Sequence, residues 1–138
     1  MSQIEVDKVI PQSGTNLQIG EVGDTINLTT ATVNLPTGVG GTSWQAIKTA
    51  NFTAVAGEGY FVNTTGGVIT ATLPSSATIG NEVSIIDYAG TADTNNITVG
   101  RNSSPIMGAA EDLTISIERA GITLVYVDST QGWLLKDK

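Results

Sequence analysis

The stretch Gly121-Ile-Thr-Leu-Val-Tyr-Val-Asp128 decides the fold that this sequence predicts. Its residues are mostly β-branched or aromatic, which is typical of a strand. Successive side chains of a strand point to opposite faces. One face would carry Ile122, Leu124 and Tyr126, and the other Thr123, Val125 and Val127. Because both faces are largely apolar, we expect both to be covered, either by a second sheet or by copies of the same chain.

Two hairpins are predicted. The strand above is followed by the polar turn Ser129-Thr-Gln-Gly132 and the apolar Trp133-Leu-Leu135. The glycine supplies a turn conformation that other residues resist. A second hairpin is predicted around Thr65-Gly-Gly67, between strands at Tyr60–Thr64 and Val68–Leu73.

Further short strands are predicted at Phe52–Val55, Glu82–Asp87, Asn96–Val99 and Leu113–Ile117. The segment Ser43–Lys48 fits either one helical turn capped by Ser43 or an extended segment. No stretch has a sustained helical period. The sequence therefore predicts an all-β protein in which residues 44–138 form a β-sandwich or barrel-like head.

Residues 1–36 contain a weak repeat in which polar and apolar residues alternate, at Asn16–Ile19, Thr25–Leu28 and Thr32–Leu35. Each copy is too short to bury its apolar face alone. We therefore expect the copies to stack as a solenoid or to be wound together with two other chains, and an irregular meander is the alternative. The glycine-rich residues 37–43 are predicted to be a flexible joint. They lack the Lys-Ser/Thr continuation of a phosphate-binding loop.

The composition favours an oligomer. We predict a homotrimer because the N-terminal strands are too short to fold alone and the C-terminal strand is apolar on both faces. Only 14% of the 138 residues are charged, and a monomer of this size buries only about two-thirds of its unfolded surface. The net charge of −7, with six basic residues, argues against a nucleic-acid-binding surface. The sequence begins without a signal-peptide pattern and contains no apolar stretch that could span a bilayer, so we expect no membrane insertion.

The side chains that catalysis needs are scarce. The chain has no His and no Cys, which excludes Ser-His and Cys-His nucleophilic sites. Glu111 and Asp112 are adjacent, so they would face opposite ways in an extended chain. The other carboxylates singled out are expected to accept backbone hydrogen bonds at turns or strand ends: Glu58, Asp87, Asp93 and Asp128. We predict that the protein is not an enzyme and has no metal or cofactor.

A series of short motifs occurs in a recognisable order. It comprises Trp44, Phe52-Thr-Ala-Val-Ala-Gly-Glu-Gly-Tyr-Phe61, Thr70-Ala-Thr-Leu-Pro74, Asp87-Tyr-Ala-Gly90, Asn95-Asn-Ile-Thr-Val-Gly-Arg-Asn102, Ile106-Met-Gly108, Leu124-Val-Tyr-Val127 and Gly132-Trp133. This series spans about residues 44–135 and resembles the C-terminal module of bacteriophage tail-fibre and related virion structural proteins, notably of marine podovirus-like phages. Residues 4–35 are similar to segments found near the start of such fibres.

The resemblance implies a β-rich, trimeric module that faces a receptor or is displayed on the virion surface. Because the sequence shows no signal-peptide pattern and no apolar span, we expect it to be made in the host cytoplasm. A tail fibre usually has a long shaft, whereas this chain has only the N-terminal repeats. Two functions therefore stay open: a short homotrimeric fibre or capsid-decorating knob, and a receptor-binding fibre tip that recognises a host surface glycan or protein.

Two groups of residues are predicted to carry these roles. The first group forms the structural core or the trimer contact: Trp44, Phe52, Tyr60, Phe61, Leu124, Tyr126 and Trp133. The second group attaches the N-terminal segment to other virion proteins of the capsid or tail: Ile4, Val6, Leu17, Ile19, Ile26 and Leu28.

Overall fold

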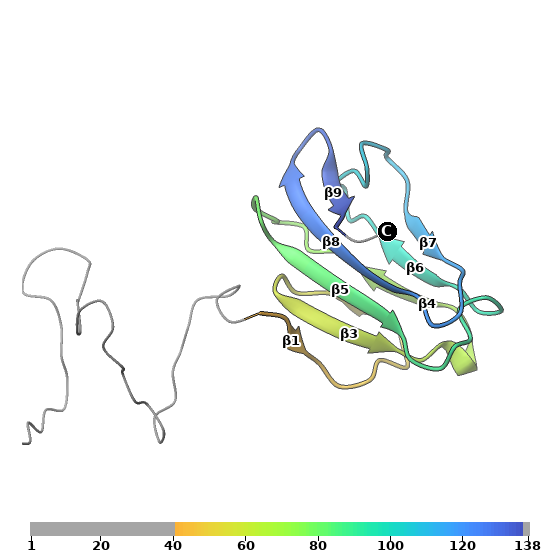
Figure 1. The fold of residues 1–138 in the computed structure, drawn as a ribbon. Coiled ribbons are helices and arrows are strands. Elements are labelled where there is room, and N and C mark those ends of the chain that lie inside the picture. Colours follow the sequence, from red (N-terminus) through yellow and green to blue (C-terminus); the bar gives the residue numbers. More distant parts are fainter. Residues whose placement is uncertain (1–40, 137–138) are drawn as a thin grey trace, which may run out of the picture. The chain divides into compact units, whose positions relative to one another are not determined.

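The computed structural model describes residues 41–136, which form strands and one short 3-10 helix (Figure 1). The predicted all-β class is confirmed. Five strands make one sheet in the order β1-β3-β5-β8-β9, and four make a second sheet in the order β2-β4-β6-β7. Both sheets are mixed. The predicted attachment residues and most of the predicted joint lie outside the described residues.

The first six strands run alternately through the two sheets. Parallel neighbours in the five-stranded sheet are β1 (Ser43–Trp44), β3 (Glu58–Val62) and β5 (Glu82–Asp87). Parallel neighbours in the four-stranded sheet are β2 (Phe52–Thr53), β4 (Ile69–Thr72) and β6 (Ile97–Gly100). Two consecutive strands thus form one coil, and successive coils stack as they do in a solenoid.

The last three strands pair antiparallel to this arrangement. β7 (Leu113–Ile115) pairs with β6, β8 (Gly121–Asp128) pairs with β5, and β9 (Gly132–Leu135) pairs with β8. The predicted terminal hairpin is therefore confirmed. Gly132 has a φ of +69°, and a Cβ on it would lie 1.9 Å from the Pro105 carbonyl oxygen. Both its backbone conformation and its surroundings therefore require glycine at this turn.

The hairpin predicted around residues 65–67 is wrong. β3 and β4 belong to different sheets, and the chain between them forms a 3-10 helix, η1 (Thr64–Gly66). The Asn63 side chain caps this turn by accepting a hydrogen bond from the Thr65 N–H. The same turn-forming residues thus carry the chain across to the second sheet, because parallel neighbours need a crossover connection.

Two other local predictions were resolved by the strands. Of the alternatives for Ser43–Lys48, the extended one is observed, as β1 and an isolated bridge from Lys48 to Val62. The strand predicted at Leu113–Ile117 ends at Ile115, and Ile117 is 70% exposed.

One hydrophobic core contains residues from both sheets. In β5, Val83 and Ile85 are completely buried, and in β6 so are Ile97 and Val99. These residues alternate with more polar or more accessible ones, as expected when one face of a strand is buried. The core also contains Leu73 from the loop after β4. Each sheet therefore has an inner face toward this core and an outer face away from it.

Candidate functional site

Three of the seven residues predicted as core or trimer contacts lie in the core. Tyr60 is 1% exposed, and Leu124 and Trp133 have no exposed surface. Phe52 and Tyr126 are partly buried and pack against the same core. The ring of Tyr126 meets that of Trp133 edge-on, with 5.5 Å between the ring centroids.

Trp44 is not a core residue. Its side chain is 46% exposed, and it lies over Gly59 of β3, where a Cβ would come within 2.6 Å of the indole. It stacks on the half-buried ring of Phe61, with 4.8 Å between the centroids. The small neighbour explains the position, because Gly59 leaves room for the indole to lie flat on the outer face of the sheet. Contact with another subunit remains the prediction for Trp44.

The phenol of Tyr60 lies in a polar cluster at the edge of the core. It donates a hydrogen bond to a Glu58 carboxylate oxygen and accepts one of 2.8 Å from the Val55 N–H. Burial and the contact with Glu58 raise the pKa of Tyr60 to about 12. The Lys48 ammonium lies 5.5 Å from the Phe52 ring centroid and 5.6 Å from that of Tyr60. Since the phenol stays protonated and hydrogen-bonded at neutral pH, this cluster holds β2 and the turn after it against β3.

Asp87 ends β5 and is 2% exposed. Its carboxylate accepts hydrogen bonds from the N–H groups of Gly90 at 3.1 Å, Ala92 at 3.3 Å and Arg119 at 2.9 Å. Burial acts to raise the pKa of Asp87, but these backbone donors together with the Thr91 N–H outweigh burial and lower the pKa. The predicted role as an acceptor at a strand end is confirmed, and Asp87 joins two loops.

The other carboxylates have local structural contacts as well. Asp128 accepts 2.8 Å hydrogen bonds from the N–H groups of Thr130 and Gln131 in the hairpin turn. Asp112 accepts one from the Arg101 N–H. Among residues 41–136, no three acidic side chains come together to hold a metal ion. In the same part of the chain, no helix is long and apolar enough to cross a membrane.

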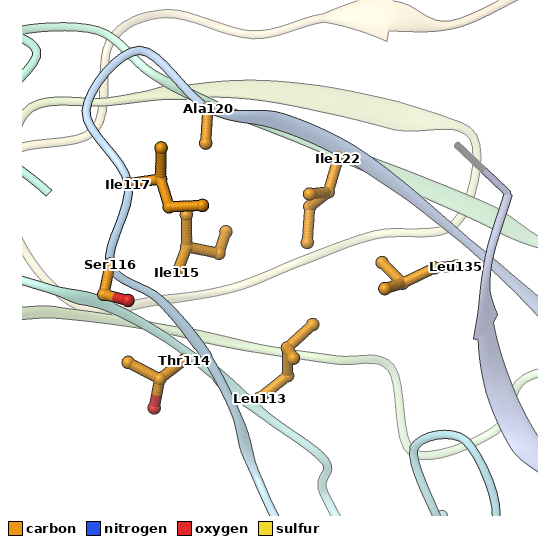
Figure 2. Close-up of a pocket in the computed structure, with 8 residues that line it drawn as sticks. All are labelled: Leu113, Thr114, Ile115, Ser116, Ile117, Ala120, Ile122 and Leu135. Carbon is orange, nitrogen blue, oxygen red and sulfur yellow. The ribbon is translucent and has the colours of Figure 1, made fainter. Parts of the chain in front are cut away.

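An apolar groove opens where the two sheets end at β7 and β9 (Figure 2). Its side chains come from β7, from the loop after it and from the two last strands: Leu113, Ile115, Ile117, Ala120, Ile122 and Leu135. Thr114 and Ser116 also line it. Its volume of about 190 Å³ is below the roughly 300–1,000 Å³ of typical small-molecule sites. The groove has room for one or two apolar side chains.

The outer faces of the two sheets differ in chemistry. On the four-stranded sheet, Thr70, Thr98 and Thr114 lie in register across β4, β6 and β7, and Thr53 lies beside Thr72. These threonines alternate with the core residues of their strands, so they point outward. This row of hydroxyl and methyl groups carries no charge. We call it the threonine face.

The outer face of the five-stranded sheet is mostly apolar, and we call it the apolar face. By the same alternation it carries large side chains from all five strands and from the residue after β5: Trp44, Phe61, Ile86, Tyr88, Val125 and Leu134. Smaller side chains lie between them, and the Ser84 and Thr123 hydroxyls are 3.0 Å apart. Its polar groups thus satisfy one another.

Sequence reasoning missed the groove and Lys48. The alternation of Leu113-Thr-Ile-Ser-Ile117 was visible, but its contact with Ile122 and Leu135 depends on pairing between distant strands. Comparison with models of known protein families and with curated proteins finds no match to this chain.

Proposed function

We propose that this chain is a structural part of a bacteriophage virion, either a short homotrimeric fibre or a capsid-decorating knob on the particle surface. In this proposal residues 44–138 form a sandwich-like head. Residues 1–36 form a repeated, shaft-like segment that attaches the head to capsid or tail proteins. The chain performs no catalysis.

The observation that supports this proposal is the position of the fibre-like sequence motifs in the fold. The motif at 52–61 includes β2 and most of β3, the motif at 70–74 overlaps β4, and the motif at 95–102 includes β6. Tyr60, Leu124 and Trp133 belong to the same series and are among the largest fully buried side chains. The residues that resemble fibre modules therefore build the sheets and their core. A resemblance that came only from a similar amino-acid composition would not fall on these positions.

A receptor-binding fibre tip is the alternative, and the groove favours it. An apolar groove beside the edge strand β7 can take side chains of an extended peptide that adds to the sheet edge. Exposed rings such as Trp44 and Tyr88 are also suited to stacking on sugars. Specific retention of the purified chain on host cells, lost on substituting Ile117→Asp, would favour this alternative over a purely structural role.

The structural role is tested by adding the purified full chain to virions made without it. The chain should occupy the particles, and a variant with Leu17→Asp and Ile26→Asp should not, because it loses two predicted attachment residues. Thr98→Asp serves as the matched control on the head and should occupy particles normally. Normal occupancy by the double variant would place the anchor in the head. A wild-type chain that never docks contradicts the virion role.

A further inference from the structure

We propose that the apolar face is the contact between copies of this chain, with the aromatic part of one copy packed on the aliphatic part of the next. This inference rests on the trimer of the proposed function. It names the surface that makes the trimer. The aromatic part consists of Trp44, Phe61 and Tyr88 with Ile86, and the aliphatic part consists of Val125 and Leu134.

The apolar face is partly exposed in the single chain, whereas most side chains of the opposite, inner face lie in the core or pack against it. Trp44 and Tyr88 are each 46% exposed, and Phe61, Ile86 and Val125 are partly exposed. Trp44 stacks on Phe61, which pairs with Ile86, and Val125 pairs with Leu134 in a second group beyond the Ser84 and Thr123 hydroxyls. Exposed apolar side chains grouped on one face mark interaction sites in soluble proteins. The strand Gly121–Asp128 was expected to be covered on both faces, and within the described residues the second sheet covers only the inner one.

The charge distribution favours a second copy as the occupant. The chain carries a net charge of −7, so two copies repel each other over most of their surface. The apolar face is an exception. Its one acidic group, Glu82, pairs with the Lys136 ammonium at 3.0 Å. The other carboxylates of these strands do not face it. Glu58 and Asp87 point inward, and the carboxylate of Asp128, at the end of β8, accepts hydrogen bonds from the turn that follows.

The rim of the face adds positive charge. Arg119 donates a 2.6 Å hydrogen bond to the Tyr88 carbonyl and packs against Gly90 beside the aromatic part. Acidic copies can therefore meet at this face with little repulsion.

The two unlike parts of the face favour a ring. A contact between different patches on identical subunits is heterologous, and it closes into a ring when the rotation between subunits closes. Packing aromatic on aliphatic parts around a three-fold axis gives each subunit one neighbour on either side. The threonine face then remains toward solvent, which suits its hydroxyl groups.

The test places one carboxylate on each outer face and measures mass by sedimentation at micromolar concentration. The wild-type full chain should sediment as three chains. Val125→Glu should give one chain with an unchanged β-rich circular dichroism spectrum, because it buries a charge in the contact. Thr98→Glu, at a matched position within the other sheet, should remain at three chains.

Three outcomes overturn the inference: three chains for Val125→Glu, loss of assembly in Thr98→Glu, or a wild-type monomer. If Val125→Glu fails to fold, Trp44→Glu replaces it, because a side chain that is 46% exposed tolerates charge in the single chain. Particle occupancy separates this inference from the virion role. If the wild-type trimer occupies virions and Val125→Glu still forms trimers, the virion role stands. Only the assignment of the apolar face as the contact is then wrong.

Discussion

The two sheets are alike on their inner faces and different on their outer faces. Both present isoleucine, valine and leucine side chains to one core. Outside, the four-stranded sheet has rows of threonine, whereas the five-stranded sheet has aromatic and aliphatic side chains. Threonine is β-branched and so favours a strand while keeping its hydroxyl in water. The contrast agrees with the proposal that the threonine face points to solvent and that the apolar face is the contact between copies.

The largest effect is expected on the inner side of the five-stranded sheet. Leu124→Ala removes a completely buried side chain and should cost about 2–5 kcal/mol of unfolding free energy. The melting temperature should fall by roughly 4–8 °C for each kcal/mol. Its neighbour Val125 points to the outer face, so Val125→Ala should mainly weaken association at a fixed concentration. Equal losses of melting temperature in the two variants, without a change in association, would break the distinction between inner and outer sides.

A smaller, pH-dependent effect is expected at the end of β5. Because the folded pKa of Asp87 is lowered, its carboxylate stabilises the fold above its ordinary pKa of 3.8. That contribution is lost as pH falls from there through the folded pKa. Asp87→Asn presents an amide to the donors that face the carboxylate and should cost about 1–3 kcal/mol at neutral pH. Unfolding by denaturant between pH 7 and pH 2 measures both curves, and they should converge in acid. A constant gap across that range would contradict the assigned role.

The smallest effect is expected on the threonine face. Thr98→Val keeps the β-branched shape at a position that points away from the core, so stability should change by no more than about 0.5 kcal/mol. Sedimentation should still give three chains. Loss of the trimer in this variant would show that the contact between copies lies on the four-stranded sheet and not on the apolar face.

The strands were predictable because alternation and β-branched residues are local signals. Glu82–Asp87 was predicted at its observed bounds, and the hairpin at Gly132 followed from its turn residues. The parallel coils were not predicted, since Thr65-Gly-Gly67 fits a hairpin as well as a crossover to the other sheet. Which partner a strand chooses is decided by distant residues that share the core.

The candidate surfaces were less predictable than the strands for the same reason. Trp44 looks like a core residue in the sequence, and only its register with Gly59 places it on an outer face. The groove likewise combines Leu113 of β7 with Leu135 of β9, which belong to different sheets. The chemistry of each side chain could be read locally, but its direction depended on sheet pairing.

Acrylamide quenching of tryptophan fluorescence shows directly whether the apolar face is the contact between copies. In the single chain Trp133 has no exposed surface and Trp44 is 46% exposed, so only Trp44 can respond to contact at the apolar face. In the assembled wild-type chain both tryptophans should resist the quencher. In Val125→Glu the fluorescence of Trp44 should become quenchable, and adding Trp44→Phe to that variant should remove the quenchable part. If Trp44 is as accessible in the wild-type chain as in Val125→Glu, the apolar face is not the contact between copies.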